Sequence, residues 1–359
     1  MSFRAALLFS LALVLVSAQT PGVPQGGGDC ADDWGCSLGG LCTQSKCSCD
    51  PWFTGPTCAL LNLQAPLDDQ GGTCGRAFDS YYSWGGRTIA NAAGTYDAII
   101  SFMCRHANLG EWTTKSSSAH FTAGSAAGPY TWGAEQCDVN GVCTPAIIPW
   151  SHNTVVIEDP AANASERFQI WHVGDGVAPP AEWAPCFNAS EVARGAAALP
   201  ATAATAAAAP RVDPGSTAYV ATAPSMAGPW ARALHNAGVP INFTGAWTSG
   251  LAGNPAPLVM PDGTINLYFT AVPCPKDAGA LAPNCIAVAT STTGWGGPFQ
   301  MNAQKEPITY PESEDPSVFR DPRGNFHLLT CVRARRRRTP PPICAPPTLF
   351  APPATTAAT

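Results

Sequence analysis

Two adjacent carboxylates, Glu314 and Asp315, are the side chains of this sequence best suited to acid and base chemistry. They stand in the segment Ser313-Glu314-Asp315-Pro316, which precedes an expected pair of strands joined by a turn over residues 318–329. Positioned carboxylates exchange protons with a bound substrate when one is ionised and the other is protonated. We therefore take both as the candidate catalytic residues; the alternative is that they only end a strand and cap a turn.

Three earlier segments start in a similar way but carry no carboxylate. They supply most of the candidate binding residues, whose side chains could hydrogen-bond to a ligand or stack on it: Trp84, His106, His152, Asn153 and Asn254. For each histidine the alternative is a structural position in the interior. The histidines do not have the spacing of metal ligands, so that we expect no metal site and no cofactor.

The elements that must position these residues follow a repeated pattern. Each copy has a polar or glycine-containing start, two apolar strands joined by a turn, and a close such as Gly128-Pro129-Tyr130, Gly228-Pro229-Trp230 or Gly297-Pro298-Phe299. Asp262-Gly263 between two apolar runs is a strong hairpin signal. Units of about sixty residues that can each make a four-stranded sheet are typical of a β-propeller. A β-sandwich is the alternative, although sandwiches do not usually repeat their closing turn.

In these segments the sequence resembles the five-bladed propellers of glycoside hydrolase family 43 and its arabinanase-like relatives. The likeness covers residues 72–331 and is carried by short motifs, among them Trp84-Gly85-Gly86, Asn254-Pro255-Ala256-Pro257 and Glu314-Asp315-Pro316. The resemblance implies a mainly β propeller fold. About four blade starts can be recognised in the sequence, and no strand pattern follows Cys331, so that we expect a closing blade to be missing or altered. We expect a low-complexity insertion over residues 193–210 and a disordered Arg/Pro/Ala tail over 332–359.

The resemblance also implies that the first residues of each innermost strand face the central axis, where family 43 enzymes hold their acids. Inverting hydrolysis needs two carboxylates about 6.5–9.5 Å apart. This chain has Trp84-Gly85 where the family has an Asp-Pro base. We therefore expect binding of an extracellular polysaccharide, glycoprotein or other extracellular protein without catalysis. The alternative is a glycoside hydrolase that acts on arabinan- or xylan-like polysaccharide.

Six cysteines between Cys30 and Cys58 mark a separate small module. The run from Cys47 to Cys58 follows C-x-C-x5-G-x2-C and resembles the closing signature of an epidermal-growth-factor-like (EGF-like) module over residues 30–58. Spacing alone leaves many pairings open. The resemblance implies these three bonds: Cys30 with Cys42, Cys36 with Cys47, and Cys49 with Cys58. So short a module cannot bury much apolar surface, so that disulfides must substitute for a core.

Two further pairs are close enough in the sequence to close small loops, Cys137 with Cys143 and Cys274 with Cys285, and we expect disulfides there. The pairing of five other cysteines stays open: Cys74, Cys104, Cys186, Cys331 and Cys344. The total of 15 cysteines is odd, so that at least one has no partner within the chain.

The amino terminus predicts export. An apolar run from Ala5 to Val16 ends in small residues, which is typical of a signal peptide over residues 1–18, followed by a linker over 19–29. The alternative, a membrane anchor, would need about twenty apolar residues. Three N-glycosylation sequons fit a secreted, oxidised protein: Asn163, Asn188 and Asn242. The net charge of −6 offers no basic face for nucleic acid, and we expect no membrane span in the mature chain.

Overall fold

The computed structural model describes residues 26–62, 82–103, 110, 112, 116–126, 128, 130–132, 151–174, 218–228, 230–233, 243–244, 251–272, 284–301, 307–309 and 313–332. The chain divides into two compact units, Met1–Asp68 (unit 1) and Asp69–Thr359 (unit 2). Strands dominate the described residues, with two short 3-10 helices, which confirms the predicted mainly β fold. No described helix is long and apolar enough to cross a membrane.

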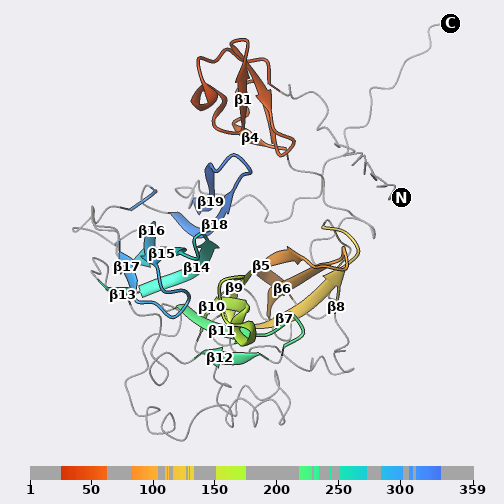
Figure 1. Ribbon diagram of the computed structural model, residues 1–359, viewed down its shortest axis with the longest axis vertical. Coiled ribbons are helices and arrows are strands. Elements are labelled where there is room, and N and C mark those ends of the chain that lie inside the picture. The colour runs from red at the N-terminus through yellow and green to blue at the C-terminus, as the bar shows by residue number, and fades with distance from the viewer. Residues whose placement is uncertain are drawn as a thin grey trace, which may run out of the picture. The chain divides into compact units, whose positions relative to one another are not determined.

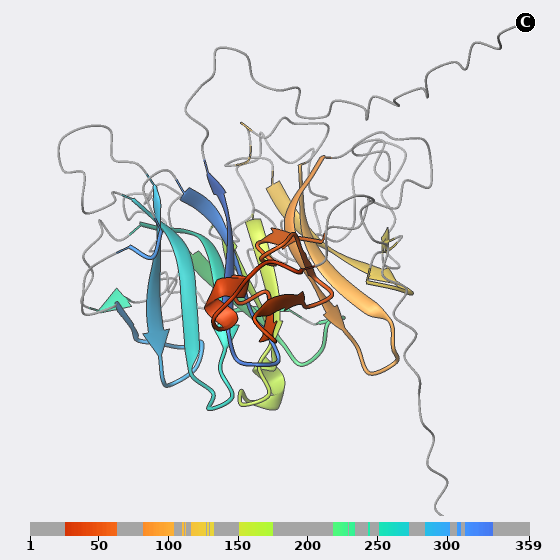
Figure 2. The ribbon, with the colours of Figure 1, turned by 90° about the horizontal axis from the view of Figure 1, so that it is seen from above.

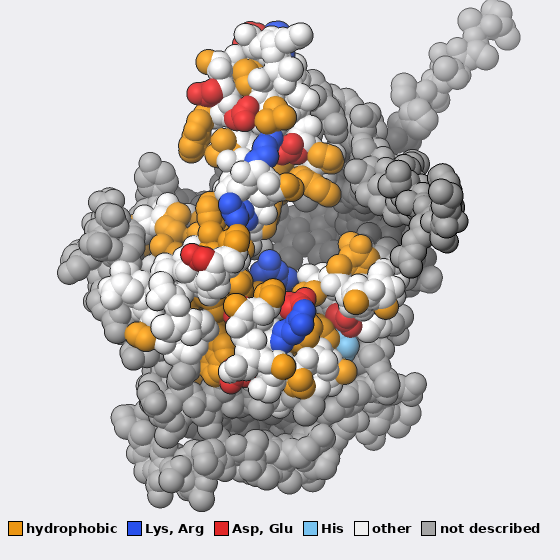
Figure 3. Space-filling model, in the orientation of Figure 1, with side chains coloured by type: hydrophobic (Ala, Val, Ile, Leu, Met, Phe, Trp, Pro, Cys, Tyr) orange, Lys and Arg blue, Asp and Glu red, His pale blue; other side chains and the backbone are white. Residues whose placement is uncertain are grey.

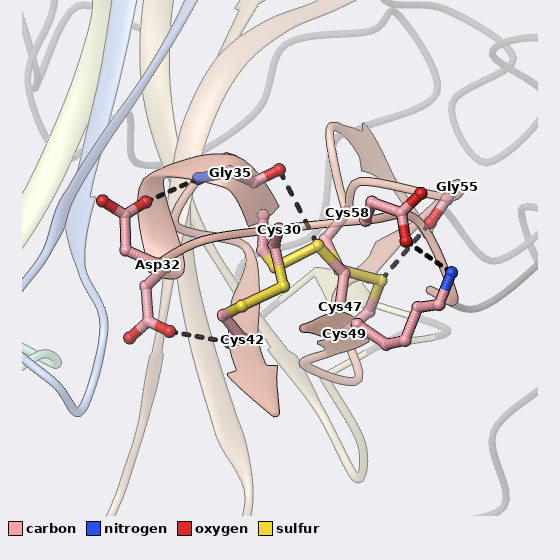
Figure 4. Close-up of a disulfide and its surroundings, with 12 residues drawn as sticks. Cys30, Asp32, Gly35, Cys42, Cys47, Cys49, Gly55 and Cys58 are labelled. Atoms are coloured by element: carbon pink, nitrogen blue, oxygen red, sulfur yellow. Dashed lines mark hydrogen bonds and ion pairs between the residues drawn. A yellow bond between two sulfur atoms is a disulfide. The ribbon is translucent and has the colours of Figure 1, made fainter. Parts of the chain in front are cut away.

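Unit 1 is built from two small antiparallel sheets and one helical turn. Its elements are η1 (Asp33–Cys36), β1 (Gly40–Thr43) paired with β2 (Lys46–Cys49), and β3 (Phe53–Thr54) paired with β4 (Leu60–Leu61). Its three disulfides join Cys30 to Cys42, Cys36 to Cys47 and Cys49 to Cys58 (Figure 4). This is the pairing that the resemblance implied.

The disulfides form most of the interior of unit 1. Within residues 26–62 the buried apolar side chains are Phe53 and three of the bonded cysteines. The chain packs closely around them: a Cβ atom on Gly40 would lie 2.3 Å from the carbonyl oxygen of Ser48, so that no larger residue fits there. Other apolar side chains of this unit are exposed: Trp34, Leu41, Trp52 and Leu60. The space-filling view shows hydrophobic side chains among acidic ones on the visible surface (Figure 3).

The described part of unit 2 consists of consecutive, mainly antiparallel sheets, which Figure 1 colours from orange to blue in chain order. The first sheet has the order β5 (Tyr82–Ala90), β6 (Tyr96–Met103), β7 (Ser116–Ala123), β8 (Thr131–Trp132). In the second sheet each strand again pairs with the next one in the chain, in the order β9 (His152–Glu158), β10 (Phe168–Val173), β11 (Ala218–Ala223), β12 (Ala231–Ala233). The short helix η4 (Ala164–Glu166) precedes β10.

The third sheet repeats this four-stranded meander and adds one strand. Its meander is β14 (Leu251–Val259), β15 (Ile265–Val272), β16 (Cys285–Ser291), β17 (Phe299–Met301), and β13 (Phe243–Thr244) pairs in parallel with β17. The fourth sheet is the hairpin of β18 (Ser313–Arg320) and β19 (Phe326–Val332). Figure 2 shows the strands of these sheets from a second direction. Three complete blades and a two-stranded fourth thus make up the described part of a propeller-like fold.

Apolar side chains fill the space between successive blades. Ile99 of the first blade packs with Val156 and Ile170 of the second. Trp171 of the second lies in one cluster with strands β15 to β17 of the third, and its ring meets that of Phe299 edge to face. The third and fourth blades share a smaller cluster, made by Ala256, Leu258 and Val318. Each blade is therefore held by burial against its neighbour rather than by its own small sheet.

The predicted repeat reappears in the turns. The serine of each Ser-x-x-Gly turn accepts a backbone hydrogen bond from the glycine and donates its hydroxyl to the glycine's carbonyl oxygen, as Ser125 does with Gly128 and Ser225 with Gly228. The following aromatic side chain turns back onto the same turn: Tyr130 donates to the carbonyl oxygen of Ala126, and Trp230 donates to that of Met226. The same contacts in two blades indicate a structural repeat.

Several predicted segments lie outside the described residues, and they stay predictions. They are the signal peptide at 1–18, most of the linker, the insertion at 193–210 and the tail after Val332. The same holds for the Cys137–Cys143 pair, for Cys274 as partner of Cys285, and for the sequons at Asn188 and Asn242. Asn163 is described and exposed, at the N-cap of η4.

Candidate functional site

The innermost strand of every blade has an irregularity at the same place. The pairing register shifts between Trp84 and Arg87 in β5, beside Asn153 in β9, between Gly253 and Ala256 in β14, and between Glu314 and Ser317 in β18. Each shift contains a residue with a left-handed backbone: Gly85 (φ 63°), Asn153 (φ 46°), Asn254 (φ 49°) and Asp315 (φ 55°). In β5 the next residue, Gly86, also has a positive φ, of 135°. Glycine, asparagine and aspartate tolerate this conformation best, which explains the residue types.

These four residues line one cavity of about 150 Å³. The other described residues of its wall are Gly86, Arg87, Thr154, Val155, Pro255, Ala256, Pro316, Ser317 and Val318. Because all four innermost strands contribute, the cavity lies where the blades converge. A cavity of this volume far exceeds the roughly 10–15 Å³ that one water molecule needs.

The carboxylate of Asp315 organises the polar groups of this cavity. Its Oδ1 accepts hydrogen bonds from the Nδ2 of Asn153 at 2.9 Å and from the Nδ2 of Asn254 at 2.5 Å. The backbone N–H of Asp315 donates to Oγ1 of Thr270 at 3.3 Å, which fixes the bulge. Side chains from the second, third and fourth blades therefore meet at one carboxylate oxygen.

The structure separates the two predicted catalytic carboxylates. Asp315 lines the cavity, whereas Glu314 is not among its described wall residues, and its Oε2 accepts a hydrogen bond from Asn284 at 3.2 Å. Successive residues of a strand point to opposite sides, and the bulge adds a local turn of the backbone. Among the described wall residues Asp315 carries the one carboxylate.

The predicted binding residues also divide into two groups. Asn153 and Asn254 line the cavity, but His152 is buried in the contact between the first two blades. There the His152 ring stacks on Trp112 with 4.8 Å between centroids, and its Nδ1 lies 2.8 Å from Oγ of Ser116. Since that hydroxyl donates to the carbonyl oxygen of Ser151 at 2.8 Å, it accepts from His152. Burial lowers the pKa of His152 to about 3, so that the ring is neutral at pH 7.

Trp84 is 38% exposed and is not among the described wall residues, and His106 lies outside the described residues. The described residues offer no metal-ligand cluster beyond Cys30, Cys36 and Cys47, whose sulfur atoms are in disulfides.

Arg87 is a residue of the cavity that the sequence reasoning missed. It belongs to β5 and is half-buried, and its Nη1 donates to the carbonyl oxygen of Pro257 on β14 at 3.4 Å. The side chain therefore reaches from the first blade to the third. A lone charge two residues beyond the Trp84-Gly85 start was the available signal, but a charge on a strand more often faces solvent.

The arrangement is suited to recognition by hydrogen bonds. Two amides, a guanidinium and a carboxylate can together donate hydrogen bonds to the hydroxyl groups of a small polar ligand and accept hydrogen bonds from them. The described wall does not contain the second carboxylate that inverting hydrolysis requires.

Gly85 leaves the space into which the Asn153 amide extends. A Cβ atom on Gly85 would lie 3.0 Å from Oδ1 of Asn153, whereas a Cβ on Gly94, another left-handed glycine, would meet no atom within 4 Å. Both Gly85→Ala and Gly94→Ala should lose about 1–2 kcal/mol of unfolding free energy to backbone strain. We expect Gly85→Ala to lose about 1 kcal/mol more, because only its new Cβ atom would crowd the Asn153 side chain. Urea denaturation of both variants measures the difference, and equal losses would show that Asn153 adjusts freely.

Comparisons with known proteins give the following similarities. No family model matches the chain, and no curated protein matches it. The chain is similar to the structure of an endo-arabinase from Bacteroides thetaiotaomicron (14% identity, 69% of this chain and 69% of that chain covered, TM-score 0.38). It is also similar to a thermostable family-43 glycoside hydrolase (11% identity, 69% and 65% covered, TM-score 0.41). A third is a family 117 glycoside hydrolase from Zobellia galactanivorans (13% identity, 65% and 59% covered, TM-score 0.36). The chain spans less than two thirds of the length of the last two, and these similarities assign no residue a role.

Proposed function

We propose that unit 2 is a carbohydrate-binding propeller whose axial cavity holds one sugar residue of an extracellular glycan without hydrolysing it. The observation that carries this proposal is the convergence of Asn153, Asn254 and Asp315 on one cavity whose described wall has a single carboxylate. Sugar hydroxyls both donate and accept hydrogen bonds, so that amides and a carboxylate can bind them in a fixed orientation.

The same proposal includes secretion and an EGF-like character for unit 1. The apolar run after Arg4 and the exposed sequon at Asn163 support export. The three disulfides of unit 1 support an oxidising compartment, because such bonds persist outside the cytosol. Unit 1 would then serve as a spacer or as a second contact surface.

The test uses full-length protein collected from the medium of secreting eukaryotic cells. The protein is applied to a glycan array and then titrated with the bound glycans, while arabinan and xylan are incubated with it to measure release of reducing sugar. We expect secretion into the medium, and saturable binding without product. As a matched control, Asp262→Asn changes an exposed aspartate in the β14–β15 hairpin and should bind like the parent protein.

Two outcomes contradict the proposal in different ways. Release of sugar by the parent protein that disappears in Asp315→Asn would make unit 2 a glycoside hydrolase. Failure to bind any glycan would remove the carbohydrate ligand altogether.

A further inference from the structure

We propose that the sugar in the axial cavity is acidic, a uronic acid residue whose carboxylate binds Arg87 while one of its hydroxyl groups donates to Asp315. This inference rests on the proposed function, because it names the class of sugar that the same cavity takes.

Arg87 has more hydrogen-bond donors than described partners. Its guanidinium makes one hydrogen bond, from Nη1 to the Pro257 carbonyl oxygen at 3.4 Å, and no carboxylate of the described residues lies within ion-pair distance. A guanidinium carries several N–H groups in a planar fork that matches a carboxylate in two places. The remaining donors therefore fit an anionic group of a ligand.

The surroundings of Arg87 add to this preference for an anion. Burial lowers the pKa of its guanidinium, which means that the site disfavours the uncompensated positive charge. A buried charge is costly unless an opposite charge or several hydrogen bonds offset it. Gly85 and Gly86, which also line the cavity, have no partner across the β5–β6 register. A ligand anion would supply the missing countercharge.

Asp315 sets a second condition on the ligand. Its carboxylate is an acceptor, and the amides of Asn153 and Asn254 both donate to the same oxygen, Oδ1. A group that approaches this carboxylate must bring a donor, because a second anion would be repelled. A simple anion such as phosphate satisfies Arg87 but not Asp315. A uronic acid residue has a carboxylate for the first and hydroxyl groups for the second.

The experiment compares matched sugars by isothermal titration calorimetry at low ionic strength. The probes are the methyl glycosides of galacturonic and glucuronic acid, their neutral counterparts of galactose and glucose, galactose 6-sulfate, and the zwitterion alanine. We expect both uronides to bind the full-length protein at least tenfold more tightly than the neutral sugars, a difference of about 1.4 kcal/mol. Added salt should reduce this ratio, since the pair is electrostatic.

Two arginine variants test whether the ratio of uronide affinity to neutral-sugar affinity depends on Arg87. Arg87→Gln should bring the uronide preference to near unity and leave weak binding of the neutral sugars. Arg320→Gln is the matched control, because Arg320 is exposed on β18 and also makes one described hydrogen bond to a carbonyl oxygen, that of Gly324. The ratio in the parent protein tests the proposal even if Arg87→Gln does not fold.

The remaining outcomes overturn the proposal and separate it from the function on which it rests. Equal binding of uronides and neutral sugars would remove Arg87 as an anion receptor but leave a carbohydrate-binding cavity. Tighter binding of the sulfate would replace the uronic acid by a sulfated sugar. Binding of alanine in preference to every sugar, or binding of no probe, would contradict both the acidic sugar and the proposed function.

Discussion

Loss of the Cys36–Cys47 disulfide, in the Cys36→Ser/Cys47→Ser variant, is expected to unfold unit 1. This bond spans a sequence separation of 11 residues in the middle of the unit. Closing a loop of this order stabilises a folded domain by about 3 kcal/mol. Apart from cysteines, Phe53 is the one buried apolar side chain among residues 26–62, so that little else there opposes the entropy of the open chain. Limited proteolysis of the full chain, followed by mass spectrometry, should find new cleavage between residues 26 and 62.

The control for this experiment is Cys331→Ser. Cys331 is an exposed thiol at the end of β19, so that its replacement should leave the proteolytic pattern of unit 1 unchanged. If the double variant stays as resistant as the parent protein, the backbone hydrogen bonds and the other two disulfides suffice to hold unit 1.

Asp315→Ala is expected to weaken ligand binding strongly and to destabilise unit 2. Without the carboxylate, the amides of Asn153 and Asn254 lose a shared acceptor, and hydrogen bonds to a charged group contribute about 1.5–3 kcal/mol each. Alanine also tolerates the left-handed backbone at this position poorly. We expect the free energy of unfolding to fall by about 3 kcal/mol and the affinity for a bound glycan to fall by about a hundredfold. Urea denaturation and calorimetry measure the two effects.

Asp315→Asn separates the charge from the geometry. Asparagine suits the left-handed backbone, as Asn153 and Asn254 show, and it keeps an acceptor oxygen. Asp315→Asn should therefore lose less stability than Asp315→Ala, while its affinity for the ligand should still fall below that of the parent protein. Should Asp315→Ala bind a glycan as tightly as the parent protein, the ligand must lie elsewhere on unit 2.

The sequence predicted the blades well because their signals are local. The Gly-Pro-aromatic closes and the Asp262-Gly263 hairpin each depend on residues that are neighbours in the chain. The convergence of the blades is a different matter, since it depends on contacts between segments far apart. Asn153 and Asp315 are 162 residues apart in the sequence, and no local pattern shows that their side chains meet.

The candidate site was predicted only in part, because its residues come together through contacts between distant segments. Asn153, Asn254 and Asp315 were named, but Glu314 was given the same role as Asp315 because the sequence does not show which of two neighbours faces the axis. The recurrence of Gly, Asn, Asn and Asp at one position of four repeats was the signal that could have separated them. Arg87 was missed because its partner, Pro257, belongs to another blade.

The left-handed position of each innermost strand accepts glycine, asparagine or aspartate. Gly85, Asn153, Asn254 and Asp315 occupy it in one molecule, with backbone φ angles from 46° to 63°. Exchange of an amide for an acid, or loss of the side chain, can thus occur there without a change in the sheets that carry it. Since these four residues line one cavity, a single substitution between asparagine and aspartate at Asn153, Asn254 or Asp315 changes the charge of the cavity wall by one unit and leaves the backbone as it is.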